Sequence, residues 1–456
     1  MTSDQFKVII IGGGPNGLTA AHSLHLAGID FLVLERASIV AKDVGASIVL
    51  APQNLRVMHQ FGILDDLNRI GQELKSNKSF DLDGASWGSN EIFETLRTNH
   101  GSPPLAFHRA QLVQAMYDGL PPVAKDKVLL SKNLVDIQSE EEGVTVTCED
   151  GSTYRGSIVI GADGVHSKTR KLMRKLALSA DATQTWDEED PFSAIYRCMW
   201  CSFPRCTEAG ETSDTQHKDR SVMYLSGRER GWIFLYEKMA EEKRGRSTYS
   251  DTDIAAYAEL FKDFPITETL KVKNVWDKRI TVGMANLEEG MASHWNWGRI
   301  AIAGDAAHKF TPNAGRGFNS GIQDIVTLCN ALRNMEEAQA GAPQSAAEEL
   351  VAISKLFDQY SQERKAAIPQ ELSMSASITR LQAWANPLYS MASKYIMPSR
   401  LVQYLLTEFM MKKNMKKALV LDYVAAEEPM KGTVPWDHSM PSPAGMEQAK
   451  HQVSAF

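Results

Sequence analysis

The chain has 456 residues, of which 43% are hydrophobic and 23% charged, and its net charge is −7 at pH 7. This is an ordinary globular composition, and the length favours two lobes or one large domain with an inserted sheet. The acidic balance argues against a nucleic-acid binder, and charged residues interrupt every long apolar run, so we expect no transmembrane span.

The first residues lack the pattern of a secretory signal, and the five cysteines have no disulfide-framework spacing. Both features favour a reducing compartment, so we expect a cytoplasmic protein. Cys198, Cys201 and Cys206 lie close in sequence but lack a second ligand pair, and we therefore expect no metal site.

Residues 7–36 predict a strand, a tight glycine turn, a helix and a second strand. Gly12 permits the turn, Gly14 lets the backbone approach a pyrophosphate, and Gly17 allows close packing of helix on strand. The second strand ends on Glu35, about twenty residues past the glycines, where a carboxylate can accept from ribose hydroxyls. The pattern predicts a site for an ADP-containing dinucleotide.

The next segments alternate between helix and strand signals. Residues 47–50 predict a strand, Pro52 opens a helix, and strand-like pieces follow at 80–82 and 92–93. Arg109 lies in the first turn of another helix, where it could donate to a phosphate or the flavin side of a dinucleotide, or could be a surface arginine. Alternating residues over 134–148 then predict a β-meander.

A buried strand over 157–160 ends in Gly161-Ala162-Asp163-Gly164, where a carboxylate between glycines can reach a ligand. Here the sequence resembles the flavoprotein monooxygenases of the para-hydroxybenzoate hydroxylase type. Their second fingerprint has Asp-Gly at this point, close to both the FAD pyrophosphate and the path of NAD(P)H.

Residues 300–324 carry the strongest pattern in the chain. A buried strand is followed by Gly-Asp-x-x-His-x-x-x-Pro-x-x-Gly-x-Gly-x-Asn-x-x-x-x-Asp, which matches the third fingerprint of that family in identity and spacing. Asp305 at the end of the strand can bind a ribitol hydroxyl, and the glycines let the backbone lie against a flat ring. The helix from Phe318 would point its N-terminal N–H groups at that ring.

Aromatic-rich strands over 185–275 predict a sheet that forms the lid and walls of an apolar substrate pocket, although a packed sheet without a ligand has the same pattern. After a break at 341–343, helices are expected over 346–364, 370–384 and 397–420. The last of these carries lysines beside apolar residues, so it could lie on a membrane surface or pack on the protein.

The resemblance implies an α/β fold with a discontinuous, Rossmann-like FAD-binding domain over 1–75, 100–180 and 276–340. A β-sheet substrate domain over 76–99 and 181–275 would be inserted into it, followed by a helical region over 341–430 and a tail over 431–456. The cofactor-binding positions that the motifs and the resemblance imply are Gly12, Gly14, Gly17, Glu35, Arg36, Val49, Arg109, Asp163, Asp305, Pro312, Gly315, Gly317 and Phe318.

The resemblance also implies the activity of a single-component monooxygenase that uses FAD, NAD(P)H and O2 through a flavin C4a-hydroperoxide. Gly45-Ala46-Ser47-Ile48 and Gly432-Thr433-Val434-Pro435-Trp436 look most like fungal specialised-metabolite enzymes, which hydroxylate or epoxidise terpenoid, meroterpenoid or prenylated indole skeletons. Among these relatives Arg197 matches an arginine near the flavin, although it could equally be a salt-bridged strand residue. Tyr224 is the weaker candidate for a catalytic tyrosine.

Other functions stay open at this point. A simple aromatic hydroxylase of the salicylate type is the closest alternative. An FAD-containing reductase would consume no oxygen, and a non-enzymatic prenyl-binding protein would need neither Asp163 nor Asp305. A flavin halogenase would need a Trp-x-Trp-x-Ile-Pro segment, and residues 295–300 lack its proline.

Overall fold

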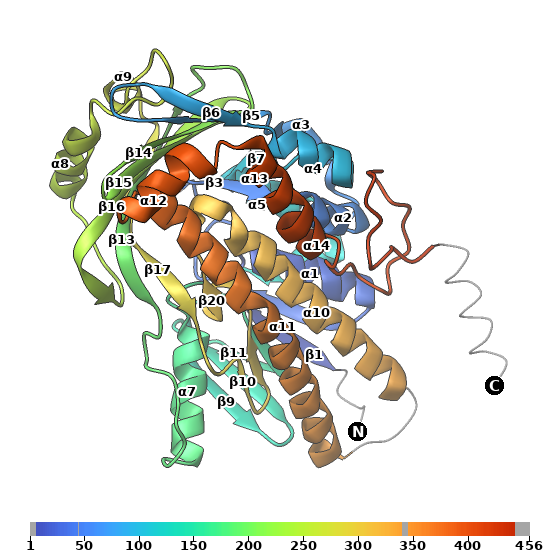
Figure 1. Ribbon diagram of the computed structural model, residues 1–456. Coiled ribbons are helices and arrows are strands. Elements are labelled where there is room, and N and C mark those ends of the chain that lie inside the picture. Colours follow the sequence, from blue (N-terminus) through green and yellow to red (C-terminus); the bar gives the residue numbers. More distant parts are fainter. Residues whose placement is uncertain (1–5, 44, 340–344, 443–456) are drawn as a thin grey trace.

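The computed structural model describes residues 6–43, 45–339 and 345–442. A parallel sheet with helices packed around it forms one half, and a larger sheet forms the other (Figure 1). A long C-terminal helix runs along both halves. This mixed architecture confirms the predicted α/β fold class.

The first half is built on a six-stranded sheet. Its centre, β1 (Lys7–Ile11), is parallel to both neighbours, β2 (Asp30–Leu34) and β12 (Ile158–Gly161). Strands buried on both faces are continuously apolar, which is the pattern that the sequence shows in these segments. The sheet is completed by β8 (Val128–Leu129), β19 (Ile300–Ile302) and β18 (Asn296–Trp297).

Two small sheets flank it. One joins β3 (Ser47–Leu50), β7 (Leu105–His108) and β4 (Gln72–Glu73), and the other is the predicted meander of β9 (Leu134–Glu140), β10 (Gly143–Cys148) and β11 (Thr153–Gly156).

The second half is an eight-stranded sheet in the order β20-β17-β13-β16-β15-β14-β5-β6. The early strand β5 pairs with β14, and β6 pairs with β5. On the other side, β17 extends the same sheet from within the segment assigned above to the FAD-binding domain. The boundary near residue 276 therefore cuts across one sheet, and the domain limits stay a prediction. The strands are β5 (Ser76–Phe80), β6 (Ser86–Asn90), β13 (Ser193–Pro204), β14 (Glu211–His217), β15 (Arg220–Ser226), β16 (Arg230–Arg244), β17 (Thr281–Met291) and β20 (His308–Lys309).

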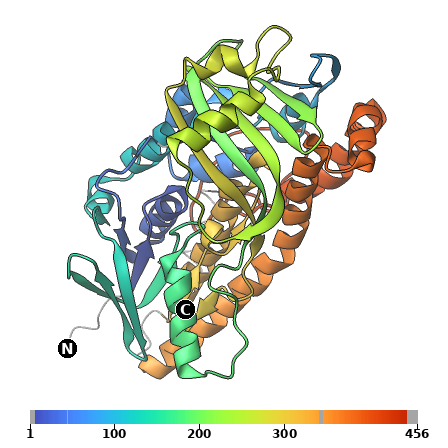
Figure 2. The same ribbon diagram turned by 90° about the vertical axis from the view of Figure 1, so that its left-hand side faces the viewer.

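Helices cover the parallel sheet and one face of the large sheet, where Figure 2 shows α8 lying across the strands. The helices before the third fingerprint are α1 (Pro15–Ala27), α2 (Pro52–Gln60), α3 (Leu64–Ile70), α4 (Ile92–His100), α5 (Arg109–Asp118), α6 (Pro122–Lys125), α7 (Lys168–Ala180), α8 (Asp251–Phe261) and α9 (Val272–Trp276). From the fingerprint onward they are η1 (Gly304–Ala306), η2 (Pro312–Ala314), α10 (Arg316–Gln339), α11 (Ala346–Gln382), α12 (Pro387–Met391), η3 (Ala392–Ile396), α13 (Arg400–Leu405), η4 (Leu406–Met411) and α14 (Lys412–Met415).

Two expectations about local structure were wrong. The strand-like piece at 92–93 is the start of α4, and the two helices expected at 346–364 and 370–384 are one continuous helix, α11, with Pro369 inside it. Proline removes one backbone hydrogen bond, but buried residues on both sides of it, among them Ile368 and Ser375, hold α11 against the protein.

The break at 341–343 and residues 443–456 of the tail lie outside the described residues. In the part of the chain that the structure describes, no helix has the length and apolar character needed to cross a membrane.

Candidate cofactor site

The glycine turn has the geometry that its residues predict. Gly12 has a φ of 104°, a conformation that favours glycine, and its N–H donates to the carbonyl of Leu34 (2.9 Å). A Cβ on Gly17 would overlap the carbonyl oxygen of Gly12, so α1 can pack this closely on β1 only through glycine. Gly14 caps α1 without a side-chain hydrogen bond, which leaves the first N–H groups of the helix for a ligand.

Glu35 holds this turn in place at the end of β2. One carboxylate oxygen accepts from the N–H of Gly13 (2.6 Å) and the other from the N–H of Ala37 (2.7 Å). A carboxylate can accept further bonds, so these contacts orient Glu35 and leave it able to receive ribose hydroxyls. The neighbouring Arg36 is exposed beyond the strand end.

Arg109 and Asp305 come to the same edge of the parallel sheet as Glu35. Burial lowers the pKa of Arg109 below its ordinary value, while the charges of Asp305 and Glu35 act in the opposite direction. Asp305 also accepts from Nζ of Lys309. One guanidinium thus faces two carboxylates that are 270 residues apart in the chain.

Asp163 has a structural role at the neighbouring strand end. Its carboxylate accepts from the hydroxyl of Ser167 (2.5 Å) and from both the N–H (2.9 Å) and the hydroxyl (3.0 Å) of Thr169. These bonds anchor the first turn of α7. A Cβ on Gly12 would lie only 3.1 Å from the Cα of Asp163. The segment around Asp163 therefore contributes to the glycine turn through its backbone, which packs closely against Gly12.

Asp324, the last residue of the third fingerprint, is fully buried and fixes the turn before Asp305. It accepts from the N–H of Gly304 (2.8 Å), from Nε2 of His308 (2.6 Å) and from Nε of Arg364 (2.7 Å). Burial alone would raise the pKa of Asp324, but His308 and Arg364 outweigh it and hold the pKa below its ordinary value. The side chain therefore stays ionised and positions the loop.

Asn319 ties the loop with the last two glycines to β3. Its amide donates to the carbonyls of Val49 (2.7 Å) and Gly315 (2.7 Å), and its oxygen accepts from the N–H of Ala51 (2.9 Å). Gly315 has a φ of 61° and ends η2, which begins at the exposed Pro312. Gly317 and the partly buried Phe318 form the first turn of α10.

The residues at this edge fit FAD. A Cβ on Gly14 would meet no protein atom within 4 Å, so open space lies where a pyrophosphate would approach the uncapped N-terminus of α1. Glu35 and Asp305 offer acceptors to ribose and ribitol hydroxyls, and Arg109 offers a donor. The backbone of Val49 and of Gly315 is fixed by one asparagine, as a flat ring requires.

Neither catalytic candidate lies on this side. Arg197 pairs with Glu237 (2.6 Å), and its guanidinium stacks over Tyr257 of α8 at 4.9 Å. Tyr224 is buried in the cluster beneath α8 and α9, and its hydroxyl bonds to that of Thr207 (2.8 Å). Because side chains alternate along a strand, these two fall on the face covered by α8 and α9, and their catalytic role stays a prediction.

The opposite face of the sheet turns toward the cofactor edge. Cys198, Leu225, Trp232, Phe234 and Tyr236 form a buried cluster against which Val49, Trp200, Met223 and Leu287 pack. Sequence reasoning missed these residues, because alternation identifies two faces without saying which one meets the flavin. The hydroxyl of Tyr236 is buried and has no hydrogen-bond partner among the described residues.

Glu288 of β17 is a second residue that the motifs did not reveal. Burial raises its pKa to about 7, with Lys309 acting to lower it and Asp190 to raise it. Its carboxylate lies 3.9 Å from Nδ1 of His166. A carboxyl group that titrates near neutral pH thus lies within electrostatic reach of Asp305.

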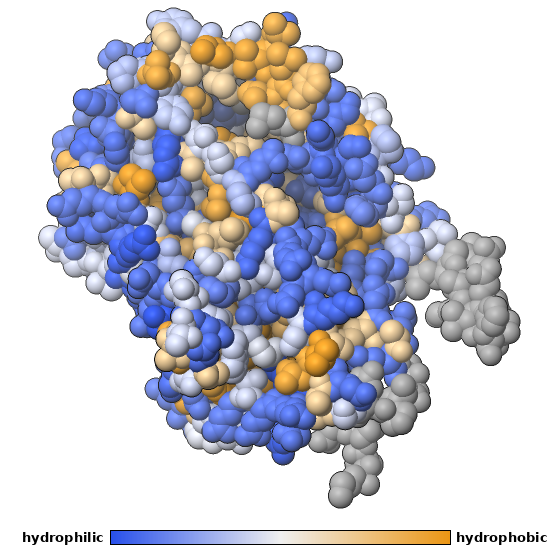
Figure 3. All heavy atoms as spheres, turned by 60° about the horizontal axis from the view of Figure 1, so that its bottom comes forward, coloured by the Kyte–Doolittle hydropathy of each residue, from blue (hydrophilic) through white to orange (hydrophobic). Residues whose placement is uncertain are grey.

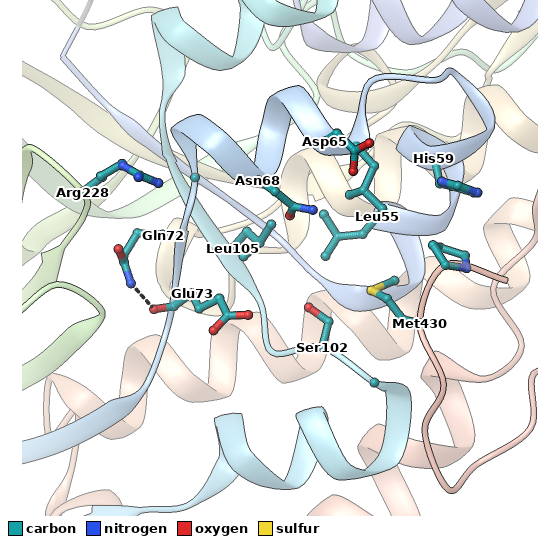
Figure 4. Close-up of a pocket in the computed structure, with 14 residues that line it drawn as sticks. Leu55, His59, Asp65, Asn68, Gln72, Glu73, Ser102, Leu105, Arg228 and Met430 are labelled. Atoms are coloured by element: carbon teal, nitrogen blue, oxygen red, sulfur yellow. Dashed lines mark hydrogen bonds between the residues drawn. The ribbon is translucent and has the colours of Figure 1, made fainter.

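A cavity of about 560 Å³ lies elsewhere, between α2, α3, β4 and the tail near Met430 (Figure 4). Leu105 lines the cavity. The adjacent Ala106 belongs to the buried cluster that packs against Val49, so it lies on the other face of β7. The cavity therefore opens on the side of the small sheet away from the cofactor edge, and none of the implied cofactor residues lines it.

Comparisons with known proteins agree with this geometry. Residues 5–375 match the family described as "FAD binding domain". The FAD-dependent monooxygenase dpmaE of Metarhizium anisopliae is 32% identical over 87% of this chain and 84% of its own, and esdpE of Penicillium shearii is 32% identical over 88% and 83%. Klebsiella pneumoniae HpxO complexed with FAD and uric acid shares the fold, with a TM-score of 0.67 at 21% identity over 90% of this chain and 95% of its own.

Proposed function

Because this chain belongs to the family of FAD-dependent monooxygenases, we propose that it inserts one oxygen atom into a hydrophobic terpenoid, meroterpenoid or prenylated indole by hydroxylation or epoxidation. The reaction consumes one NAD(P)H, one proton and one O2, and releases NAD(P)+ and water beside the oxygenated product. FAD, when bound and reduced, supplies the activation of O2 at its C4a carbon. Fungal secondary metabolism is the proposed setting, since these relatives are fungal proteins.

The observation that carries the proposal is the convergence of Glu35, Arg109 and Asp305 opposite an apolar wall. The three polar side chains lie at one edge of the parallel sheet, and the wall of Trp200, Phe234 and Leu287 faces that edge across Val49. An apolar wall with few polar groups suits a large hydrophobic substrate and excludes water from the reacting ring.

The chain's own residues have three tasks in this scheme. The network of Asp324, His308 and Arg364 fixes the turn that presents Asp305 to the cofactor. Asn319 fixes the backbone against which a flat ring lies. The aromatic side chains of the wall, backed by the fully buried Tyr236, exclude water from the reacting ring.

The test is oxidation of NADPH and of NADH, with O2 uptake, by purified protein loaded with FAD. Prenylated phenols, indole alkaloids, cyclic terpenoids and simple phenols are compared as substrates. We expect turnover with a prenylated or terpenoid class and a product heavier by one oxygen atom. Turnover with simple phenols alone would favour the aromatic hydroxylase, whereas flavin reduction without O2 uptake would favour a reductase.

Flavin content separates the remaining outcomes. A protein that binds no FAD would overturn the enzymatic proposal as a whole. A protein that binds FAD and slowly oxidises NAD(P)H with each compound, without forming an oxygenated product, would overturn the proposed substrate class. A cytoplasmic location stays a prediction that this assay does not address.

A further inference from the structure

The C-terminal helices between residues 387 and 411 expose most of their large apolar side chains. Leu388, Tyr395, Leu401, Tyr404 and Phe409 have exposed fractions between 61% and 76%. Figure 3 shows apolar side chains gathered at the top of that view, over these helices. Met391, Ile396 and Leu405 of the same segment are exposed as well, and the remaining exposed large apolar residues of the described chain are scattered over both halves of the protein. Single exposed residues need no explanation, but a contiguous group of this kind marks an interaction surface.

The polarity of this segment is inverted. Between residues 384 and 411, the fully buried side chains among those described are the hydroxyl residues Ser393 and Thr407. Ser393 donates to Gln216 of β14, and Thr407 donates to the carbonyl of Gln403 (2.7 Å). A helix on a protein surface in water normally has apolar residues inside and polar residues outside. The reverse arrangement indicates that the outer face meets an apolar medium.

The segment is held firmly in this orientation. Trp384, just before it, donates its Nε1 hydrogen to the same oxygen of Gln216 that Ser393 uses (2.9 Å). The ammonium of Lys394 lies 4.4 Å from the centre of the Trp384 ring. These contacts attach η3, and with it the start of the segment, to β14 of the large sheet.

Charge identifies the occupant. Residues 387–417 contain six basic residues and a single acidic one, Glu408, in a chain whose net charge is −7. Arg400, Lys413 and Lys417 of this segment are exposed. A second copy docking through the same surface would bring the basic groups together, since a two-fold interface uses the same patch twice. Anionic lipid headgroups complement them, and tyrosines beside basic residues are typical of membrane interfaces.

We infer that residues 387–417 form a docking surface for an anionic lipid bilayer, with Tyr395, Leu401, Tyr404 and Phe409 entering the headgroup region and Arg400, Lys413 and Lys417 contacting the headgroups. This inference does not depend on the proposed reaction. The docking surface begins at α12 and η3, and Ser393 of η3 is bonded to the same sheet that carries the apolar wall.

The test is flotation of the FAD-loaded full chain with vesicles of phosphatidylcholine alone and with vesicles that also contain about one-fifth phosphatidylserine. We expect binding to the mixed vesicles that weakens with salt. Replacing Leu401, Tyr404 and Phe409 by serine should lower the partition coefficient by roughly tenfold or more, because apolar burial is lost. Replacing Arg400, Lys413 and Lys417 by glutamine should remove the preference for phosphatidylserine.

The matched control replaces Val123, Leu260 and Val351, which are exposed elsewhere, by serine, and it should bind vesicles like the unchanged protein. Flavin absorbance and the unfolding midpoint verify that each variant is folded. Equal binding by the control and patch variants, or no vesicle binding by the unchanged protein, would overturn the inference. A dimer in light scattering that the Leu401, Tyr404 and Phe409 variant abolishes, without vesicle binding, would assign the surface to a second copy.

Discussion

The cofactor edge and the large sheet differ in how their predicted residues behave. At the cofactor edge, Glu35, Arg109 and Asp305 come together, although they are far apart in the sequence. In the large sheet, Arg197 and Tyr224 lie on the face covered by α8 and α9. A fingerprint with fixed spacing specifies a local backbone shape, whereas one residue in a strand specifies only one of two faces.

The largest expected effect comes from a substitution that disrupts the cofactor edge. Asp324→Asn leaves the buried guanidinium of Arg364 without its compensating charge, so the free energy of unfolding should fall by roughly 3–5 kcal/mol. The turn that carries Asp305 should loosen, and the purified variant should lose most of its flavin. Urea unfolding and flavin absorbance measure both effects. Asp358→Asn on α11 is the control, because its partner Asn296 is an exposed polar contact and its loss should be nearly neutral.

A pair of glycine variants separates the fold of this edge from its ligand. Gly17→Ala should destabilise the protein by roughly 1–3 kcal/mol, because its Cβ overlaps the carbonyl of Gly12. Gly14→Ala should leave the apoprotein about as stable as before, since its Cβ meets no protein atom, and yet weaken FAD binding by roughly tenfold. Unchanged FAD affinity in Gly14→Ala would contradict the placement of the pyrophosphate.

A pH titration tests the packing of α1 beside the cofactor edge, because α1 carries the buried His22. Its ring stacks on Phe61 and bonds to the carbonyl of Met116, and burial lowers its pKa from 6.5 to about 4. Between these values the unfolded chain binds a proton that the folded chain does not, so stability falls as the pH drops. The loss from His22 should be roughly 2 kcal/mol at pH 5.

The measurement is the urea midpoint between pH 7.5 and 5 in the unchanged protein and in His22→Gln. Burial also lowers the pKa of His100 to about 4, so the variant should keep part of the slope. A slope identical in both proteins would show that His22 is protonated equally in the folded and unfolded states.

The smallest effects distinguish the two faces of the large sheet. Tyr224→Phe loses the bond to Thr207, so stability should fall by about 1 kcal/mol while kcat and KM stay unchanged. Tyr236→Phe removes a buried hydroxyl that has no partner among the described residues, so stability should hold or rise. A fall in kcat for Tyr224→Phe alone would reverse the assignment of the faces.

The sequence by itself determined the α/β class, the glycine turn, the meander and the third fingerprint. These features depend on local backbone chemistry, such as the positive φ of Gly12 and Gly315, or on apolar runs that only a buried strand explains. It also placed Glu35 and Asp305 at strand ends, and strand ends of a parallel sheet meet at one edge. That is why the cofactor site could be predicted from residues far apart in the chain.

Only the tertiary structure decided the rest. It showed that Asp163 anchors α7, that Pro369 lies inside a continuous helix, and that β5 and β6 join a sheet formed mainly by much later strands. The tertiary structure also shows that Tyr236 lies on the face of the sheet nearer the cofactor edge, whereas Arg197 lies on the opposite face. The physical reason is that alternation fixes which residues share a face, while the packing of α8 and α9 on one side decides which face remains for the flavin.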